Sequence, residues 1–413
     1  MIKLCVNMDL FRKKIEPKSI ACFFCIYLIV FGPRIGGVFD LSVLTSGVLL
    51  LFILGKGQIS LQTKKLSAIL LLLIIDTFLV SCFSEEGVNL IFLLKFVRVL
   101  FTLLCISNYV ELDVVKPIVI RSSLINVLLM HAAVIIIGSA FWPEFQNILK
   151  PLSGFDRMPT FFRSTGFTNG YDFAGLLCLF GVLITYFSKI ERLKMIKVIL
   201  FIVAALLTSR VNMILTEIVM VWLLFFSKGE KKIKLLLEVL FVFSLFPVLG
   251  IFLFTTQNQD NFIVQMLLKN EFFANVSTKL VYYYATSSVD SSLSQHYNFD
   301  MLTNAQILFG SMQDAKLDPG YTQYIYRIGV LGTAVCLLFY VAVISNAWKI
   351  KQVNKQDAFI VICICLMCVV MSVKNSYLLA RHVTETLLVM NFLLVKEYNN
   401  VQSLQIIKRK VHI

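Results

Sequence analysis

The sequence predicts an all-α, polytopic integral membrane protein with about twelve transmembrane helices, and three observations support this fold class. Apolar side chains make up 58% of the 413 residues, and only 15% are charged. No single soluble core could bury so much apolar surface. The apolar residues form runs near the length of about 20 residues that crosses a bilayer as a helix, and lysine and arginine cluster in the short stretches between these runs. We therefore expect residues 1–413 to form one membrane domain.

Twelve apolar segments are predicted to cross the membrane. The first follows a basic leader and lacks a small-residue cleavage site, so it is interpreted as a retained helix and not as a removed signal. The segments are residues 20–36, 40–55, 66–83, 88–110, 117–142, 171–188, 197–209, 211–226, 235–254, 322–346, 357–373 and 377–395.

The basic residues predict the orientation of the segments. The leader, the basic loops and the Lys408-Arg409-Lys410 tail are expected on the cytoplasmic side, and Ser84-Glu85-Glu86 on the outward side. Residues 197–226 lie between two basic loops and must cross an even number of times. We therefore predict a short hairpin broken at Thr208-Ser209-Arg210, whose apex lies in the outer half of the membrane. The alternative is one long tilted helix with a basic loop on the wrong side.

Two outward loops are long, at residues 143–170 and 255–321. The second contains two stretches, 262–268 and 297–308, whose apolar spacing suits amphipathic helices on the membrane surface or over a cavity. We expect this loop to act as a lid.

Charge and cysteine usage exclude several classes of function. A net charge of +14 could indicate a nucleic-acid partner, but the basic residues follow the positive-inside pattern of a membrane protein, so no nucleic acid is expected. Nearly all of the ten cysteines lie inside apolar runs, where they act as small hydrophobic residues. The Cys22–Cys25 spacing has no second pair and no nearby histidine, so we predict neither a metal site nor a cofactor.

Arginines mark the predicted active site. Arg163, Arg210 and Arg327 all fall at the outward ends of predicted spans. Guanidinium groups donate paired hydrogen bonds to phosphate oxygens, so three of them at one level suit a diphosphate. The alternative is that each anchors its helix at the interface. Arg98, three residues from Lys95 and near mid-span, is a fourth candidate for substrate binding, and pairing with a buried carboxylate is its alternative.

Few acids or bases accompany these arginines. Asp318 could accept a proton from a substrate hydroxyl, although Asp-Pro-Gly is equally a turn signal before a helix. His296 in the second long loop is a further candidate, with a surface histidine as the alternative. His131, inside an apolar span, is interpreted as a packing residue.

These segments resemble motifs of the O-antigen polymerase and ligase superfamily. Residues 162–170 (FRSTGFTNG) resemble its Arg-x-x-Gly-x-x-x-x-Asn pattern, with Gly170-Tyr171 in place of the usual Pro-Asn. Residues 208–210 (TSR) are similar to its Ser-Arg hairpin. Residues 318–321 (DPGY), followed by 327–332 (RIGVLG), are similar to its segment that enters the span after the large outward loop.

The resemblance implies a metal-independent glycosyltransferase, a Wzy-type polymerase of the bacterial cell inner membrane. Such an enzyme joins undecaprenyl-diphosphate-linked oligosaccharide repeats into O-antigen or capsular polysaccharide at the periplasmic face, with a flippase and a chain-length regulator as expected partners. Asp318, Arg163 and Arg210 are then expected in catalysis. Arg327, Arg98, Gly166, Asn169, Tyr321 and His296 are expected to bind substrate. The alternatives are an O-antigen ligase, a flippase or polysaccharide transporter, and a non-catalytic membrane partner of a polysaccharide assembly complex. Ligases of the superfamily commonly have histidine where this chain has Asp318.

Overall fold

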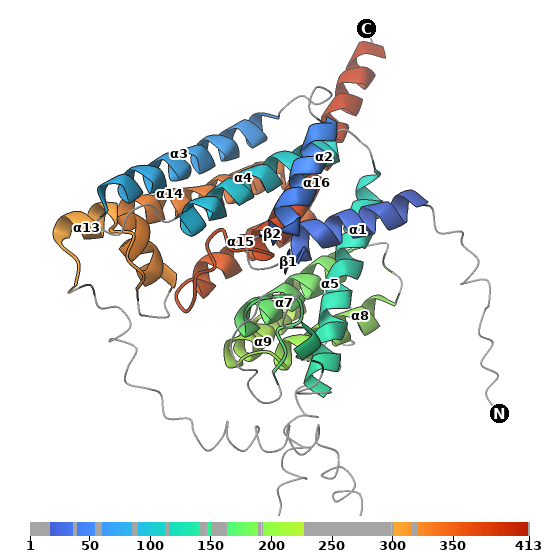
Figure 1. Cartoon of the computed structure of the whole chain (residues 1–413). Coiled ribbons are helices and arrows are strands. Elements are labelled where there is room, and N and C mark those ends of the chain that lie inside the picture. Colours follow the sequence, from blue (N-terminus) through green and yellow to red (C-terminus); the bar gives the residue numbers. More distant parts are fainter. Residues whose placement is uncertain are drawn as a thin grey trace, which may run out of the picture.

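The computed structural model describes residues 17–35, 39–53, 60–84, 90–111, 115–140, 145, 147–149, 163–188, 191, 193–226, 299, 301–315 and 320–411. Almost all regular structure in these residues is helical (Figure 1). The helices are α1 (Pro17–Phe31), α2 (Leu41–Ile53), α3 (Leu61–Phe83), α4 (Leu90–Glu111), α5 (Pro117–Ala140), α7 (Tyr171–Phe187), α8 (Lys194–Leu206), α9 (Arg210–Phe226), α13 (Asn304–Phe309), α14 (Gly320–Ile350), α15 (Lys355–Met371) and α16 (Val383–Val411).

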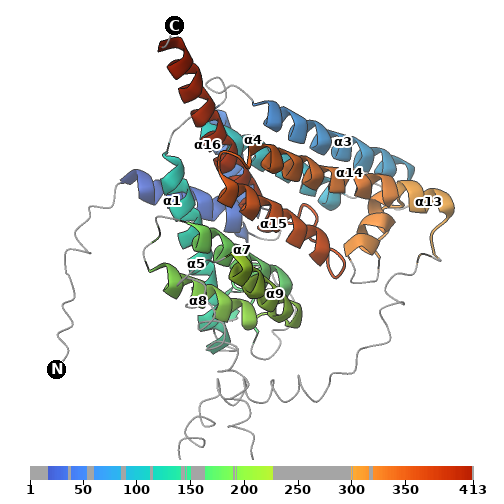
Figure 2. The same cartoon turned by 180° about the vertical axis from the view of Figure 1, so that it is seen from behind.

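The helices form two groups joined by a middle layer. In Figures 1 and 2, α3, α4 and α14 lie side by side, and α5, α7, α8 and α9 form a second group. Between them, α16 contacts both α4 and α5, and α15 contacts both α14 and α7. Side chains from both groups and from the middle layer contribute to one buried apolar core.

The helices have the composition of membrane segments. Within the described residues, four are long and apolar enough to cross a bilayer, namely Leu61–Phe83, Phe92–Glu111, Pro117–Ala140 and Gly320–Ile350. On α3, the exposed side chains include Leu72, Ile75 and Phe78. A row of exposed large apolar side chains on a helix is unfavourable in water and favourable in lipid. The chain is therefore an α-helical protein with apolar helices suited to a bilayer.

Each predicted span except 235–254, which lies outside the described residues, corresponds to a helix. The predicted break in 197–226 is confirmed, because α8 ends at Leu206 and α9 begins at Arg210. The lid predicted in residues 255–321 lies mostly outside the described residues, although its end contains the short helix α13.

The predicted span 322–346 is bent. Gly329 in α14 has φ 66° and ψ −176°, which interrupts the helix. The bend frees backbone carbonyls, and the segment after α13 satisfies them: the Ser311 N–H donates to the Tyr326 carbonyl at 2.9 Å, and the Met312 N–H donates to the Arg327 carbonyl at 3.2 Å. A Cβ at residue 329 would lie 2.3 Å from the Leu308 carbonyl oxygen, so this close approach requires glycine.

The start of the last predicted span is wrong. Residues 377–395 were expected to be helical, but α16 begins at Val383. Leu379 and His382 instead have positive φ values of 50° and 71°. Distant groups bond to this irregular backbone, since the Leu379 N–H donates to the Tyr340 hydroxyl at 2.9 Å and the Tyr324 hydroxyl donates to the Leu378 carbonyl. Non-helical backbone is tolerated at membrane depth when the surrounding protein satisfies it in this way.

A two-residue antiparallel pair, β1 (Arg34–Ile35) and β2 (Phe39–Asp40), departs from the all-α prediction. It lies between α1 and α2, where Asp40 accepts from the Ser42 N–H and pairs with Arg381 at 2.9 Å. The ion pair fixes the residues before α16 to the α1–α2 connection.

Candidate functional site

The segment around Arg163 is a compact turn at the start of α7. Residues Ser164, Thr165 and Thr168 are buried. The Thr168 hydroxyl lies 2.9 Å from the Thr165 carbonyl and 2.9 Å from the Gly170 carbonyl. The Arg163 guanidinium carbon lies 5.8 Å from the centre of the Tyr171 ring, a cation–π distance. The turn is therefore held by its own hydroxyls, and Arg163 lies over the first residue of α7.

His131 of α5 fixes this turn from beneath. Its Nδ1 accepts from the Phe167 N–H at 3.2 Å, so the proton is on Nε2, which donates to the Ala174 carbonyl at 3.3 Å. The ring stacks on Phe31 of α1 with centroids 4.7 Å apart. The prediction that His131 is a packing residue is confirmed, because both nitrogens are bonded and the side chain is fully buried.

The same contact explains Gly166. It has φ 54°, and a Cβ there would lie 2.6 Å from the His131 ring. A side chain at this position would be strained and would overlap the imidazole. The glycine predicted to bind substrate thus allows the turn to lie directly on His131, while Asn169 in the same turn is exposed.

The predicted hairpin apex lies against the same end of α7. Asn212, in the first turn of α9, donates from Nδ2 toward the Tyr171 carbonyl at 3.3 Å and the Asp172 carbonyl at 3.1 Å, and lies 3.0 Å from the Thr208 hydroxyl. A Cβ at Gly175 would lie 2.1 Å from the Asn212 amide nitrogen. The backbone of Arg210 is therefore next to the first turn of α7, although its side chain lies outside the described residues.

The connection between α15 and α16 meets both α7 and α14. Lys374 forms an ion pair with Asp172 in the first turn of α7, with Nζ 3.1 Å from Oδ2. The Tyr377 ring lies 4.6 Å from that of Phe173. On the other side, the Tyr321 N–H donates to the Ser372 carbonyl at 3.1 Å. The α15–α16 connection therefore links the starts of α7 and α14, the two ends that sequence analysis assigned to one level.

Tyr321 is only partly available to a substrate, since its hydroxyl donates to the Val369 carbonyl at 2.7 Å. Asp318 lies outside the described residues, two positions before the start of α14, and His296 lies outside them as well. The roles of Asp318 and His296 remain predictions.

Arg327 and Arg98 both have acidic partners, with different burial. Arg327 donates from Nε and Nη2 to Asp314 at 2.9 and 2.6 Å, and Asp314 is 73% exposed. Arg98 pairs with Glu385 at 2.7 Å, and the two side chains are only 6% and 1% exposed. Lys95, one turn from Arg98, donates to the Tyr324 hydroxyl. Arg98 thus has the arrangement of a buried ion pair between α4 and α16.

Sequence analysis missed Lys374. It is a single lysine in the three-residue gap between the predicted spans 357–373 and 377–395, and no motif surrounds it. The available signal was the predicted topology, which places residues 374–376 and Arg163 on the same, outward side of the membrane. Its ion pair with Asp172, 202 positions away in the chain, shows only in the fold.

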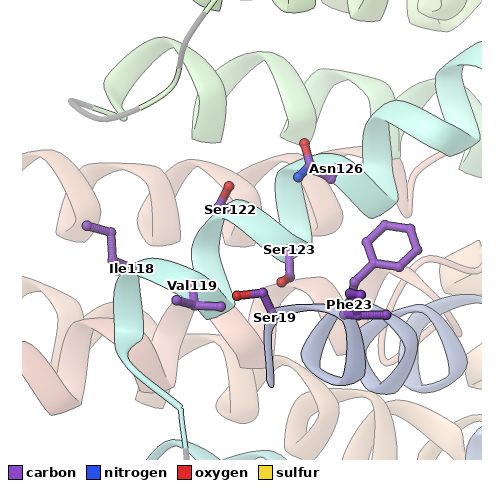
Figure 3. A pocket seen from close by; sticks show the side chains of 8 residues that line it. Ser19, Phe23, Ile118, Val119, Ser122, Ser123 and Asn126 are labelled. Carbon is purple, nitrogen blue, oxygen red and sulfur yellow. The ribbon is translucent and has the colours of Figure 1, made fainter. Parts of the chain in front are cut away.

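A groove of about 450 Å³ lies elsewhere, between the N-terminal parts of α1 and α5 (Figure 3). It is lined by Ser19, Ile20, Phe23, Ile118, Val119, Ser122, Ser123 and Asn126. The opposite end of α1 carries Phe31, which contacts His131 below the Arg163 turn. The groove therefore lies away from the Arg163 turn and contains none of the predicted site residues.

No family model matches the chain, and no curated protein matches it.

Proposed function

We propose that the chain is a Wzy-type polymerase, a glycosyltransferase that joins lipid-linked oligosaccharide repeats at the periplasmic face of the bacterial inner membrane. The observation that carries the proposal is the meeting of three distant segments. The Arg163 turn, the α8–α9 break before Arg210 and the start of α14 after Asp318 all converge on the first turn of α7 and the α15–α16 connection. These are the same segments whose motifs resemble the O-antigen polymerase and ligase superfamily.

The chemistry suits guanidinium groups. A hydroxyl of the incoming repeat attacks the anomeric carbon of the growing glycan, and the bond from that carbon to the lipid diphosphate breaks. Negative charge grows on the departing diphosphate, and arginines can neutralise it with paired hydrogen bonds. We assign this role to Arg163 and Arg210, and Asp318 is our candidate to accept the hydroxyl proton.

The membrane arrangement is part of the proposal. Twelve spans with the N-terminus in the cytoplasm would put α7, the hairpin apex and the α15–α16 connection at the outward face. Undecaprenyl diphosphate in the outer leaflet could then present its phosphates to the arginines, with its chain in lipid. The proposed partners are a flippase that supplies the repeats and a regulator of chain length.

The test is to reconstitute the purified protein in vesicles with lipid-linked repeats and a lipid A acceptor, and to separate the products by size. A ladder of increasing glycan length on the lipid supports the polymerase. Transfer of glycan only to a lipid A acceptor would indicate a ligase. Movement of unaltered repeats across vesicles without any new glycosidic bond would indicate a flippase or transporter, and either result would refute the proposal.

A further inference from the structure

We propose that Lys374 is a third cation of the phosphate site, beside Arg163 and Arg210, and that its ion pair with Asp172 orients it. The Tyr377 hydroxyl is a neutral hydrogen-bond donor of the same site. This inference rests on the proposed function for the identity of the ligand as a lipid diphosphate. The contacts that support it are made by Lys374, Asp172 and Tyr377, which lie outside the motifs described above.

The ion pair leaves Lys374 able to bind an anion. Its side chain is 47% exposed, whereas that of Asp172 is 14% exposed. Nζ lies 3.2 Å from Oδ1 and 3.1 Å from Oδ2, so the ammonium approaches both oxygens of one carboxylate from a single direction. An ammonium group has three N–H donors. Asp172 therefore orients Lys374 and still leaves donor capacity for a phosphate oxygen.

Asp172 is itself fixed in place. It is the second residue of α7, where the helix dipole favours a negative charge. Its backbone carbonyl accepts from Asn212 of the hairpin. The residue before it, Tyr171, carries the Arg163 guanidinium over its ring. Lys374 is thus attached to the same helical turn that positions Arg163, and the two cations approach that turn from different segments.

Tyr377 provides an independent observation. Its side chain is fully buried, and its hydroxyl has no hydrogen-bond partner among the described residues. A buried hydroxyl without a partner costs free energy, and such groups are commonly explained by function or by a missing ligand. The ring packs on Phe173, next to Asp172, and the Asp172 carboxylate is within electrostatic range of the phenol. Because the hydroxyl is covered in the structure, a phosphate oxygen would supply the missing acceptor once a small side-chain movement opens access to it.

The connection has the construction of a rigid platform. The Ser372 carbonyl accepts from the start of α14, the Lys374 N–H donates to the Met371 carbonyl at 3.0 Å, and the Tyr377 N–H donates to the Asn375 carbonyl at 2.8 Å. Figures 1 and 2 both show the end of α15 between the first part of α14 and the group that contains α7. Because the backbone of this connection is already ordered, binding of an anion costs no further backbone conformational entropy.

The experiment measures binding of two probes, inorganic pyrophosphate and a short prenyl diphosphate, to purified protein in detergent, without a requirement for polymerisation. Lys374→Gln removes the charge and keeps the length of the side chain, and we expect it to weaken binding of both probes at least about tenfold. Lys374→Arg should retain most of the affinity. Asp172→Asn, which leaves the ammonium but loosens its orientation, should have a smaller effect than Lys374→Gln.

Two further variants complete the design. Tyr377→Phe should weaken binding about fivefold while the protein elutes as the parent does, because the ring packing on Phe173 is kept. Lys355→Gln is the matched control: Lys355 is exposed and lies at the other end of α15, so its loss should leave binding unchanged.

The outcomes separate this inference from the proposed function. Parent-like affinity in Lys374→Gln, with weak binding in Arg163→Ala, would overturn the role of Lys374 and leave the polymerase intact. Equal loss in Lys374→Gln and Lys355→Gln would show that only net charge matters, and would also overturn it. If the parent binds the probes through Lys374 but makes no glycan ladder, the site stands and the polymerase fails.

Discussion

The two ends of α15 carry charges in opposite ways. At its N-terminal end, Asp357 accepts from Arg121 and from the Asn354 amide, and Glu397 accepts from the same two residues. At its other end, the half-exposed Lys374 meets one carboxylate, and the nearby buried Tyr377 hydroxyl has no hydrogen-bond partner within the part of the chain that the structure describes. At the first end, each charged group has partners within the protein. At the second end, Lys374 keeps N–H groups that can donate to a ligand.

This difference separates structural charge from functional charge. Arg121 pairs with two acids, Asp357 and Glu397, and so connects α5, α15 and α16. A carboxylate and a guanidinium that saturate each other gain little from a ligand. N–H groups of a cationic side chain that have no acceptor within the protein can instead donate to a bound anion.

The largest expected effect is the loss of polymerisation when Arg163 or Arg210 is replaced. Arg163→Ala and Arg210→Ala should each abolish the glycan ladder while the protein stays in the membrane at the parent level, because each loses a paired contact to phosphate. Lysine at either position should restore only part of the activity, since it lacks the planar fork. A full ladder from either alanine variant would contradict the diphosphate site.

The buried pair between Arg98 and Glu385 should affect stability. Glu385→Gln leaves the Arg98 charge unpaired in a buried position, at a cost of about 3–5 kcal/mol in unfolding free energy. Replacement of both residues by apolar ones of similar volume should recover most of it. Asp314→Asn breaks the exposed pair with Arg327 as the control and should cost less than about 1 kcal/mol. Denaturation in micelles measures all three.

The double variant at Arg98 and Glu385 also sharpens the comparison of functions. A protein that unfolds like the parent and still makes a ladder would assign Arg98 to structure. A stable double variant that makes no polymer would instead support the substrate-binding role predicted for Arg98 from the sequence.

A smaller effect is expected at Gly166. Gly166→Ala combines the strain of a positive φ with overlap on His131, and should destabilise the protein by about 1–3 kcal/mol and reduce polymer formation. Gly47→Ala is the control, because a Cβ there meets nothing within 4 Å and the residue lies inside α2. Alanine at 47 should be neutral or stabilising by up to about 1 kcal/mol. Equal effects at both sites would contradict the role of the His131 contact.

The smallest expected effect is that of metal removal. Polymerisation should continue in excess chelator, because arginine and lysine neutralise the leaving group in this account. Loss of the ladder on chelation, with recovery on addition of magnesium or manganese, would show that a metal does this work.

Local patterns in the sequence predicted most helices and not the details of the site. Apolar runs and basic loops predicted the helices and the break before Arg210, because both depend on hydrophobicity and local charge. The predicted start of the last span was wrong, because residues 377–380 are apolar enough to continue a span. Their actual backbone depends on hydroxyls of Tyr324 and Tyr340 that come from α14.

The site residues divide in the same way. Arg163 and Arg210 stand in recognisable short motifs, so the sequence could point to them. The contact of Gly166 with His131 and the pair of Lys374 with Asp172 join residues far apart in the chain. Neither contact has a local signal, because both depend on how helices pack and not on the pattern within one helix.

The most direct test of the account is whether the Arg163 turn faces outward and is covered by substrate. The starting chain has Cys5 and Cys82, the exposed cysteine of α3, both changed to serine. In it, Asn169→Cys adds a thiol to an exposed position of the turn, and Lys65→Cys adds one near the start of α3. With a membrane-impermeant maleimide on intact spheroplasts, we expect residue 169 to label, residue 65 to label only after lysis, and a prenyl diphosphate to protect residue 169. Labelling of residue 169 only after lysis, or without protection by the diphosphate, would contradict an outward phosphate site.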